Sequence, residues 1–198
     1  MARNKELNQQ MKDARIEQIL SSALKLFSTK GLAATKITDI SEAADMSQGL
    51  IYHYYKSKEE IFIELIRGAF EKINAGSLYI ENLPLSPREK IKTAIEGILE
   101  NLEVSENSAR YHLLVVHASI STAIPREAKS IIESENKKPY DTIARIIKAG
   151  QADGTIKNFD ADELATIFWT SVKGLAMHKA VQGAKFKSPD PEILMSMF

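Results

Sequence analysis

The 198-residue chain contains no cysteine. Disulfide bonds, thiolate nucleophiles and thiolate metal sites are therefore excluded. A long apolar run is also missing, because the most weakly charged stretch, residues 111–125, contains His112 and His117 and is too short and polar to span a bilayer. The first 15 residues are polar and have no apolar signal region. We therefore expect a cytoplasmic protein that makes no membrane contact.

The chain has no excess of charge of either sign. Its 26 Lys and Arg side chains balance 26 Asp and Glu, which argues against a generally basic coat for nucleic acid. The first 58 residues carry nine basic against six acidic side chains, an asymmetry small enough to arise by chance. Any interaction with nucleic acid must therefore depend on a local motif.

Catalytic and cofactor motifs are missing as well. No serine lies in a G-x-S-x-G turn, and no glycine-rich phosphate loop is present. His112 and His117 are five residues apart, so they do not share a helix face as a metal-binding i, i+4 pair would. We therefore expect neither an enzyme, nor a cofactor, nor a metal site.

Helical periodicity dominates the sequence that is present, and no β-type alternation of useful length occurs. Gly31 is expected to end the first helix, Ser47 to cap the third, and a capping box of Ser57 and Glu60 to open the fourth. The predicted helices cover residues 12–29, 37–44, 47–54, a long segment from 57, then 87–104, 108–122, 126–150 and 160–183. The fold class is all-α.

Residues 35–58, TKITDISEAADMSQGLIYHYYKSK, are the most informative segment. Two short helices joined by a tight turn form a unit that fits the major groove of DNA. Ile51 and Tyr55 are four residues apart and are expected to face the core. The other side chains of the second helix are expected to be largely exposed: Ser47, Gln48, Leu50, Tyr52, His53 and Tyr54.

These exposed groups suit DNA. The hydroxyl groups of serine and tyrosine, the histidine ring and Lys58 can donate to phosphate oxygens. Gln48 can pair with adenine, Leu50 can touch a thymine methyl, and Gly49 lets the backbone approach closely. Each residue alone has a plainer explanation, such as a partly buried tyrosine or a solvated lysine. Their joint arrangement after a short helix and a turn outweighs those explanations.

Residues 13–73 resemble the DNA-binding region of the tetracycline-repressor (TetR) family of bacterial regulators. The resemblance lies in L-F-S-T-K-G at residues 26–31 and in the segment that continues through K-S-K-E-E-I-F; G-Q-A-D-G-T-I at 150–156 resembles the join between the family's seventh and eighth helices. It implies about nine helices, a homodimer and a pseudo-palindromic operator. It also implies DNA-facing roles for Lys36, Thr38, Ser47, Gln48, Gly49, Leu50, Tyr52, His53, Tyr54 and Lys58.

Some positions depart from the family pattern. Lys36 stands where the family has a threonine or serine that caps the second helix, so either Thr35 takes over the cap or Lys36 reaches a phosphate. Leu50 replaces a small hydroxyl residue, and the family's histidine at Tyr54 stands one place earlier here. These changes affect the operator sequence rather than DNA binding itself.

The resemblance divides the chain into a flexible arm (1–12), a helix-turn-helix DNA-binding domain (13–73, with the motif at about 36–55) and an effector-binding and dimerisation domain (74–198). An apolar pocket with few polar groups suits a small apolar or amphipathic effector. Simple core packing is the alternative for each candidate. The candidate pocket residues are Tyr111, His112, Val115, His117, Tyr140, Phe168, Trp169, Val172 and Met177.

Two apolar segments near the C-terminus are expected to pair with a second copy in a four-helix interface. Packing within one chain is the alternative. The interface candidates are Leu164, Ile167, Ser171, Gly174, Leu175, Ile193, Leu194, Met197 and Phe198. The last helix is short for the family, so either it continues beyond Phe198 or the dimer rests mainly on residues 160–183.

Together these features predict a ligand-responsive, sequence-specific transcriptional regulator, most simply a repressor that a small molecule releases from its operator. The alternative is a helical ligand- or protein-binding module without direct DNA binding.

Overall fold

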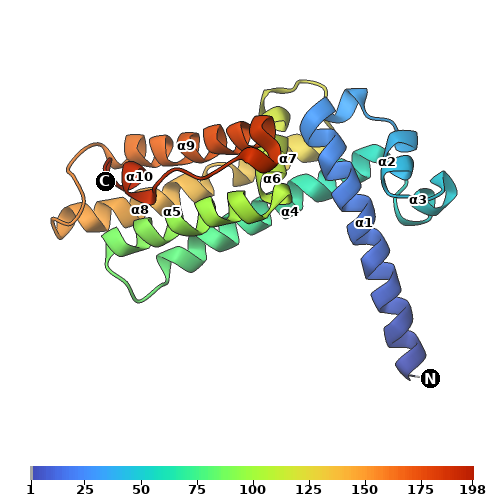
Figure 1. Cartoon of the computed structure of the whole chain (residues 1–198), viewed down its shortest axis with the longest axis horizontal. Helices are drawn as coiled ribbons and strands as arrows, with labels where there is room; N and C mark the ends of the chain where they lie inside the picture. The colour runs from blue at the N-terminus through green and yellow to red at the C-terminus, as the bar shows by residue number, and fades with distance from the viewer. Residues whose placement is uncertain (1) are drawn as a thin grey trace.

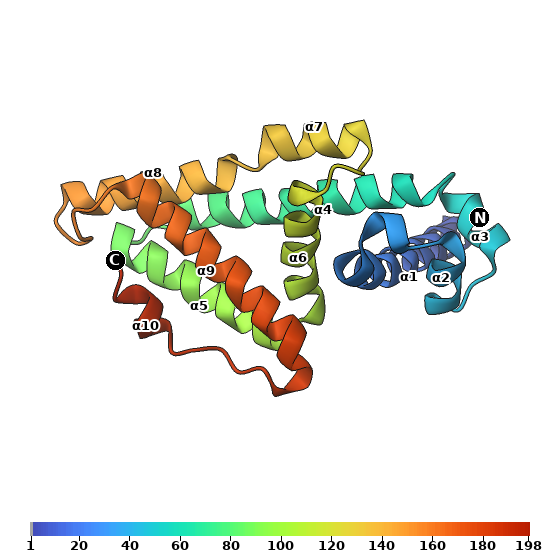
Figure 2. The ribbon, with the colours of Figure 1, turned by 90° about the horizontal axis from the view of Figure 1, so that it is seen from above.

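The computed structural model describes residues 2–198, and every regular element in that range is helical (Figure 1). The all-α prediction is confirmed. The helices are α1 (Ala2–Ala34), α2 (Ile37–Ala43), α3 (Gln48–Tyr54), α4 (Lys58–Glu81), α5 (Pro87–Val104), α6 (Glu106–Ile120), α7 (Arg126–Glu135), α8 (Lys138–Ala152), α9 (Ala161–Gln182) and α10 (Pro191–Met195), with a 3-10 turn, η1 (Gly183–Lys185), after α9. Helices α1–α3 form a head at one end, and α4 runs from it into the body (Figures 1 and 2).

Helix α1 is longer than predicted. It begins at Ala2, so residues 2–12, which we expected to be a flexible arm, are helical, whereas Met1 lies outside the described residues. Ile19, Ala23 and Phe27 are fully buried, as their helical spacing predicts. Gly31 breaks the regular helix as expected, because its φ of 76° is a conformation that favours glycine.

The turn between α2 and α3 is tight and well tied. Asp45 takes a left-handed φ of 48°, which aspartate tolerates better than most residues. The Met46 N–H donates to the Ser41 carbonyl at 2.9 Å, and the Gln18 side chain donates to the Ala44 carbonyl at 2.6 Å. Helix α1 therefore fixes the position of the turn that orients α3.

Both predicted serine caps are present. Ser47 Oγ accepts the Leu50 N–H at 3.2 Å, and Ser57 Oγ accepts the Glu60 N–H at 3.3 Å. The second half of the predicted capping box is wrong, since the Glu60 carboxylate accepts the N–H of Lys56 at 2.6 Å and not that of Ser57. The Glu60 carboxylate thus reaches one residue further back along the chain than a standard capping box requires.

Helix α4 continues unbroken through the expected domain boundary at residue 73. Its far end is held to α8, where Arg145 donates to both oxygens of Glu81 at 2.7 and 2.8 Å and lowers the pKa of that carboxyl. On another side α7 holds it, through an ion pair of Arg67 with Glu127 at 2.7 Å. Helix α4 is thus held by α8 at its far end and by α7 nearer the head.

The predicted single helix over 126–150 is wrong, because the structure divides it into α7 and α8. Pro139 explains the break: it lacks a backbone N–H, and in a continuous helix its ring would clash with the carbonyl of Glu135. Helix α6 begins two residues earlier than predicted, since Ser105 Oγ caps it by accepting the Ser108 N–H at 3.3 Å. The other body helices lie close to their predicted bounds.

The head and the body are joined through a shared apolar core. The head cluster, which includes Phe27, Ile40 and Ile51, continues into Leu114 on α6 and Ile132 on α7. A second cluster lies among α5, α8, α9 and the C-terminal segment. Because the first cluster is continuous, a movement of α6 or α7 would displace side chains that pack against the head.

Candidate nucleic-acid interface and ligand cavity

The predicted division of α3 into a buried and an exposed face is confirmed. Ile51 and Tyr55 are buried in the head core. Burial, together with the nearby Glu64 carboxylate, raises the pKa of Tyr55. Tyr52 is 53% exposed, unusually open for a large aromatic side chain. Ser47, Gln48, Gly49 and His53 are exposed beside it.

Two residues of this face are less exposed than predicted. Leu50 is half-buried, and Tyr54 packs against the head core. The His53 ring meets the edge of Tyr54 with 5.1 Å between centroids. Tyr54 therefore supports His53 and the end of α3 rather than standing free toward a partner.

At the start of α2, one of the two alternatives for Lys36 can be dismissed. Thr35 is fully buried and its hydroxyl donates to the Gly31 carbonyl at 2.8 Å, so it does not cap α2. Instead the Asp39 carboxylate accepts the backbone N–H of Lys36 at 3.1 Å. The Lys36 side chain is exposed, and Thr38 is half-buried on the first turn of α2.

Lys58 starts α4 as predicted, but its ammonium is not free. Its Nζ lies 2.9 Å from the Leu32 carbonyl, 2.7 Å from that of Thr35 and 3.5 Å from that of Ala33. These carbonyls lie at the end of α1, where that of Leu32 also accepts a turn hydrogen bond from the Thr35 N–H at 3.3 Å, so the lysine caps that end. All three donors are engaged, and a phosphate contact would require at least one to be released.

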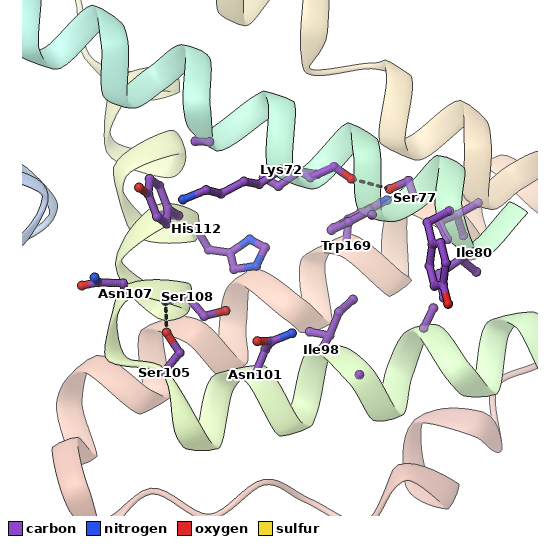
Figure 3. A pocket seen from close by; sticks show the side chains of 18 of the residues that line it. Lys72, Ser77, Ile80, Ile98, Asn101, Ser105, Asn107, Ser108, His112 and Trp169 are labelled. Atoms are coloured by element: carbon purple, nitrogen blue, oxygen red, sulfur yellow. Dashed lines mark hydrogen bonds between the residues drawn. The ribbon is translucent and has the colours of Figure 1, made fainter. Parts of the chain in front are cut away.

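A cavity of about 870 Å³ lies where the head meets the body, walled by α1, α4, α5, α6, α8 and α9. Its volume is within the usual range of small-molecule sites. Figure 3 shows α4 and α5 along its two long sides and α6 across one end. Ile16, Leu20 and Ser21 of α1 are part of the lining. A molecule in the cavity would therefore touch the head directly.

The two ends of the cavity differ in polarity. Near α6 lie the polar side chains of Lys72, Asn101, Ser108 and His112 (Figure 3). Toward the opposite end lie Ile80 and Ser77, whose hydroxyl already donates to the Ile73 carbonyl at 2.9 Å. Trp169 of α9 and Ile98 of α5 lie between them. Such a cavity suits an amphipathic molecule.

His112 is enclosed by the body helices. Burial and, to a lesser degree, the nearby Lys173 ammonium lower its pKa from 6.5 to about 4. At neutral pH the imidazole is therefore uncharged, with one nitrogen that donates and one that accepts.

Two glycines open the cavity, and sequence reasoning missed them. Gly76 of α4 and Gly97 of α5 both line it, and a Cβ atom added at either would meet no atom within 4 Å. Glycine in a helix costs about 0.5–1 kcal/mol relative to alanine. Because neither glycine prevents a clash, what their missing side chains provide is space.

Of the predicted pocket residues, Tyr111, His112, Phe168 and Trp169 line the cavity. The other five lie outside its lining. Val115 belongs to the head core, Val172 is packed in the body core, and Met177 is exposed on the outer side of α9. Tyr140 lies behind Trp169, 6.1 Å between ring centroids, and His117 lies in the last turn of α6 outside the lining. Lys72 and Asn101 line the cavity but were not predicted.

Most of the predicted interface residues near the C-terminus are packed within the single chain. Leu164 and Phe198 lie in the body core, and Leu194 and Met197 pack against it, because α10 folds back onto α5 of the same chain. Leu175 also packs inward, and Ser171 is half-buried. Ile193 remains exposed. Intrachain packing thus accounts for most of the last segment.

Two of the predicted interface residues, Ile167 and Gly174, belong to an exposed apolar stripe on α9. Ile167, Gly174, Met177 and Val181 recur at helical spacing on its outer side, and Val181 is 77% exposed. A row of apolar side chains around a glycine permits another helix to approach closely.

Within residues 2–198, the structure has no helix apolar and long enough to cross a membrane.

Comparison with known proteins relates the head of this chain to a bacterial protein family. Residues 19–65 match the model described as bacterial regulatory proteins, tetR family. The transcriptional repressor KstR2 of Mycolicibacterium smegmatis is 26% identical over 165 residues, which cover 81% of this chain and 78% of that protein. The transcriptional regulator AcrR of Shigella flexneri is 30% identical over 99 residues, or 50% of this chain and 45% of that one.

The fold is shared as well. The crystal structure of the MbdR regulator from Azoarcus sp. CIB superposes with a TM-score of 0.78 at 24% identity, covering 92% of this chain and 95% of that one. The match over 19–65 spans the segment from the buried face of α1 through α3 into α4. Motif, fold and relatives agree: the DNA-binding head of this chain matches the tetR family of bacterial regulatory proteins, and the whole chain shares the fold of such regulators.

Proposed function

We propose that this protein is a transcriptional repressor that binds a pseudo-palindromic operator as a homodimer and is released when a small apolar or amphipathic effector fills the cavity. The observation that carries the proposal is the shared wall of the cavity: α1 belongs both to the DNA-reading head and to the lining. A bound effector therefore contacts the head and the body at once.

On this proposal the exposed face of α3 enters the major groove. Ser47, Gln48, Gly49 and Tyr52 are the residues for base and phosphate contacts near the start and middle of the helix. Lys36, Thr38 and His53 lie where they could contact the backbone on either side. The amide donors of the first turn of α3 favour an anionic partner.

The effector acts only through a difference in its affinity for the DNA-competent and released arrangements. Helix α6 connects the two sites: Asn107 donates to Ser21 of α1 at 3.4 Å, while His112 of the same helix lines the cavity. A family of regulators, not of enzymes, matches this chain, and its relatives give no support to a module without DNA binding.

The first experiment is selection of bound duplexes from a random pool by the purified protein, with its mass measured by light scattering. Recovery of a two-fold symmetric site bound by a dimer is expected. Failure to enrich any duplex at low salt, from a folded dimer, would contradict the proposal.

The selected duplex then tests the reading face. Tyr52→Ala is expected to weaken operator binding by roughly 1–3 kcal/mol, the scale of a hydrogen bond to a charged group. Fluorescence anisotropy measures the affinity, and Tyr52→Phe separates the hydroxyl from the ring. The control is Tyr79→Phe, on the exposed far part of α4. Unchanged affinity of Tyr52→Ala would remove Tyr52 from the interface.

The cavity is tested by filling it. Gly97→Leu is expected to abolish duplex release by any compound that releases the parent protein, while operator affinity without compound is retained. Gly68→Leu is the matched control, because Gly68 is also in a helix with open space around it but lies outside the cavity. Release that is unaffected by Gly97→Leu would place the effector elsewhere.

A further inference from the structure

Charge at the α6 end of the cavity is unbalanced. The Lys72 ammonium extends from α4 toward α6 and lies 4.1 Å from the centroid of the Tyr111 ring (Figure 3). Among the described side chains it forms no ion pair. The Tyr111 ring stabilises the ammonium only partly, and no described carboxylate lies within ion-pair distance of it.

A second lysine lies behind the same end. Lys173 of α9 donates to the Tyr140 hydroxyl at 2.7 Å, a neutral partner, and it is close enough to His112 to disfavour the protonated imidazole. Two ammonium groups with neutral partners thus flank one uncharged histidine. Both ammonium groups favour an anion over a cation beside His112.

Carboxylates also line the cavity, on α1, the helix that packs against α6. Asp13 and Glu17 are exposed to solvent, as Lys72 is, and neither lies within ion-pair distance of Lys72. Asp13 also accepts a hydrogen bond from Gln9 at 2.8 Å. Lys72 is therefore left without a directly paired carboxylate, and a ligand carboxylate beside it would supply one.

We infer that the effector is an elongated amphipathic anion, with a carboxylate-type group beside Lys72 and His112 and an apolar portion that extends between α4 and α5 toward Ile80. The inference rests on the proposed effector role of the cavity. The anion would accept charge-assisted hydrogen bonds from the Lys72 ammonium and a hydrogen bond from the imidazole of His112. Gly76 and Gly97 leave room for the apolar portion.

Three probes of equal chain length test the charge: decanoate, 1-decanol and decylamine, each titrated calorimetrically into the full chain at pH 7.5 without DNA. Decanoate is expected to bind at least about 10-fold more tightly than 1-decanol, and decylamine most weakly. Equal affinity of acid and alcohol, tighter binding of the amine, or no binding by any probe would overturn the inference.

Lys72→Met removes the charge but keeps an apolar stem. It is expected to weaken decanoate binding about 10-fold and to change 1-decanol binding less than about twofold. Lys129→Met, on the exposed surface of α7, is the control and should change neither. A melting curve confirms that each variant is folded. Unchanged decanoate affinity in Lys72→Met would overturn the assignment.

An NMR titration of His112 gives an independent readout. Decanoate should raise the pKa of the imidazole, whereas 1-decanol should not. Because none of these measurements involves DNA, a negative result leaves duplex selection and the Tyr52 variants as separate tests of the proposed function.

Discussion

At the scale of single residues, the Lys58 side chain caps the C-terminal end of α1, a helix distant from it in sequence. Its ammonium satisfies carbonyls at the end of α1 that lie more than twenty residues earlier. Lys58→Met is expected to lower the free energy of unfolding by about 1–3 kcal/mol, because those carbonyls lose a charged donor. Urea denaturation measures the change, with Lys56→Met as the exposed control.

The salt dependence of operator binding tells the two roles of Lys58 apart. If Lys58 is purely a structural cap, Lys58→Met leaves the slope of log affinity against log salt unchanged. If Lys58 instead binds a phosphate, the same substitution lowers that slope by about one unit. We expect an unchanged slope, since the ammonium is already engaged. A lower slope would show that DNA releases the lysine from its carbonyls.

His112 makes a pH prediction. Its pKa is lowered to about 4 in the folded protein, against 6.5 in the unfolded chain, so between these values the unfolded chain binds more protons and stability rises with pH. The contribution of neutral His112 is complete above pH 6.5 and is lost as pH falls toward 4, by at most roughly 3 kcal/mol. His112→Phe should remove this part of the pH dependence; unfolding curves at pH 7 and 4.5 measure it, and identical dependence in both proteins would contradict the burial.

Local sequence explains why some of these residues were predictable. The buried and exposed faces of α3 follow from its period, so Ile51 and Tyr52 were assigned correctly. The partners of Lys58 and the charge environment of His112 arise from residues distant in sequence, and no local pattern contains them.

At the scale of helices, two helical glycines, Gly97 and Gly150, have opposite purposes. A Cβ at Gly97 would enter open cavity, whereas one at Gly150 would lie 2.6 Å from the Ile156 side chain and 3.0 Å from Pro87 Cβ. Gly97→Ala is therefore expected to stabilise the fold by about 0.5–1 kcal/mol. Gly150→Ala should destabilise it by about 1–3 kcal/mol through overpacking.

Thermal melts of the two variants side by side give the signs. A decrease with Gly97→Ala would mean that the glycine is needed for packing and not for space. The close approach at Gly150 also explains the G-Q-A-D-G-T-I segment: the turn after α8 folds back so that the Thr155 and Ile156 N–H groups both donate to the Gly150 carbonyl, at 2.8 and 2.9 Å.

Helix positions were predictable where caps and breaks are local, and less so elsewhere. Ser47, Ser57 and Gly31 marked ends correctly. Pro139 was a local signal for the break between α7 and α8 that the apolar periodicity across it obscured. The cavity could not be predicted, because it is enclosed by helices that are distant in sequence and meet only in the tertiary structure. Gly76 and Gly97 enlarge it, since neither has a side chain.

At the scale of the whole molecule, the head is not an independent unit. Its core extends into α6 and α7, and the cavity has a wall on α1. The Glu81–Arg145 pair holds the far end of helix α4 to α8, and this limits the rotation of the head relative to the body. An effector that spreads α1 from α6 would therefore change the head's angle directly.

Such a change matters only if two heads are held at a fixed spacing, which is the purpose of the proposed dimer. The exposed α9 stripe around Gly174 is the surface that we expect to pair, together with the neighbouring α8 (Figure 1). Gly174→Glu is a sharp test, because a glutamate there meets open space in the single chain and favours a helix more than glycine does. Any loss must then come from the interface.

Light scattering should show that Gly174→Glu shifts the protein from dimer to monomer, and anisotropy should show at least a 10-fold loss of operator affinity, because one head alone gives up the second half-site. Ile193→Glu tests the other candidate segment; although 62% exposed, Ile193 lies on α10, which packs on its own α5. We expect it to leave the dimer intact. The reverse result, a dimeric Gly174→Glu and a monomeric Ile193→Glu, would move the interface to the C-terminal segment and separate it from α9.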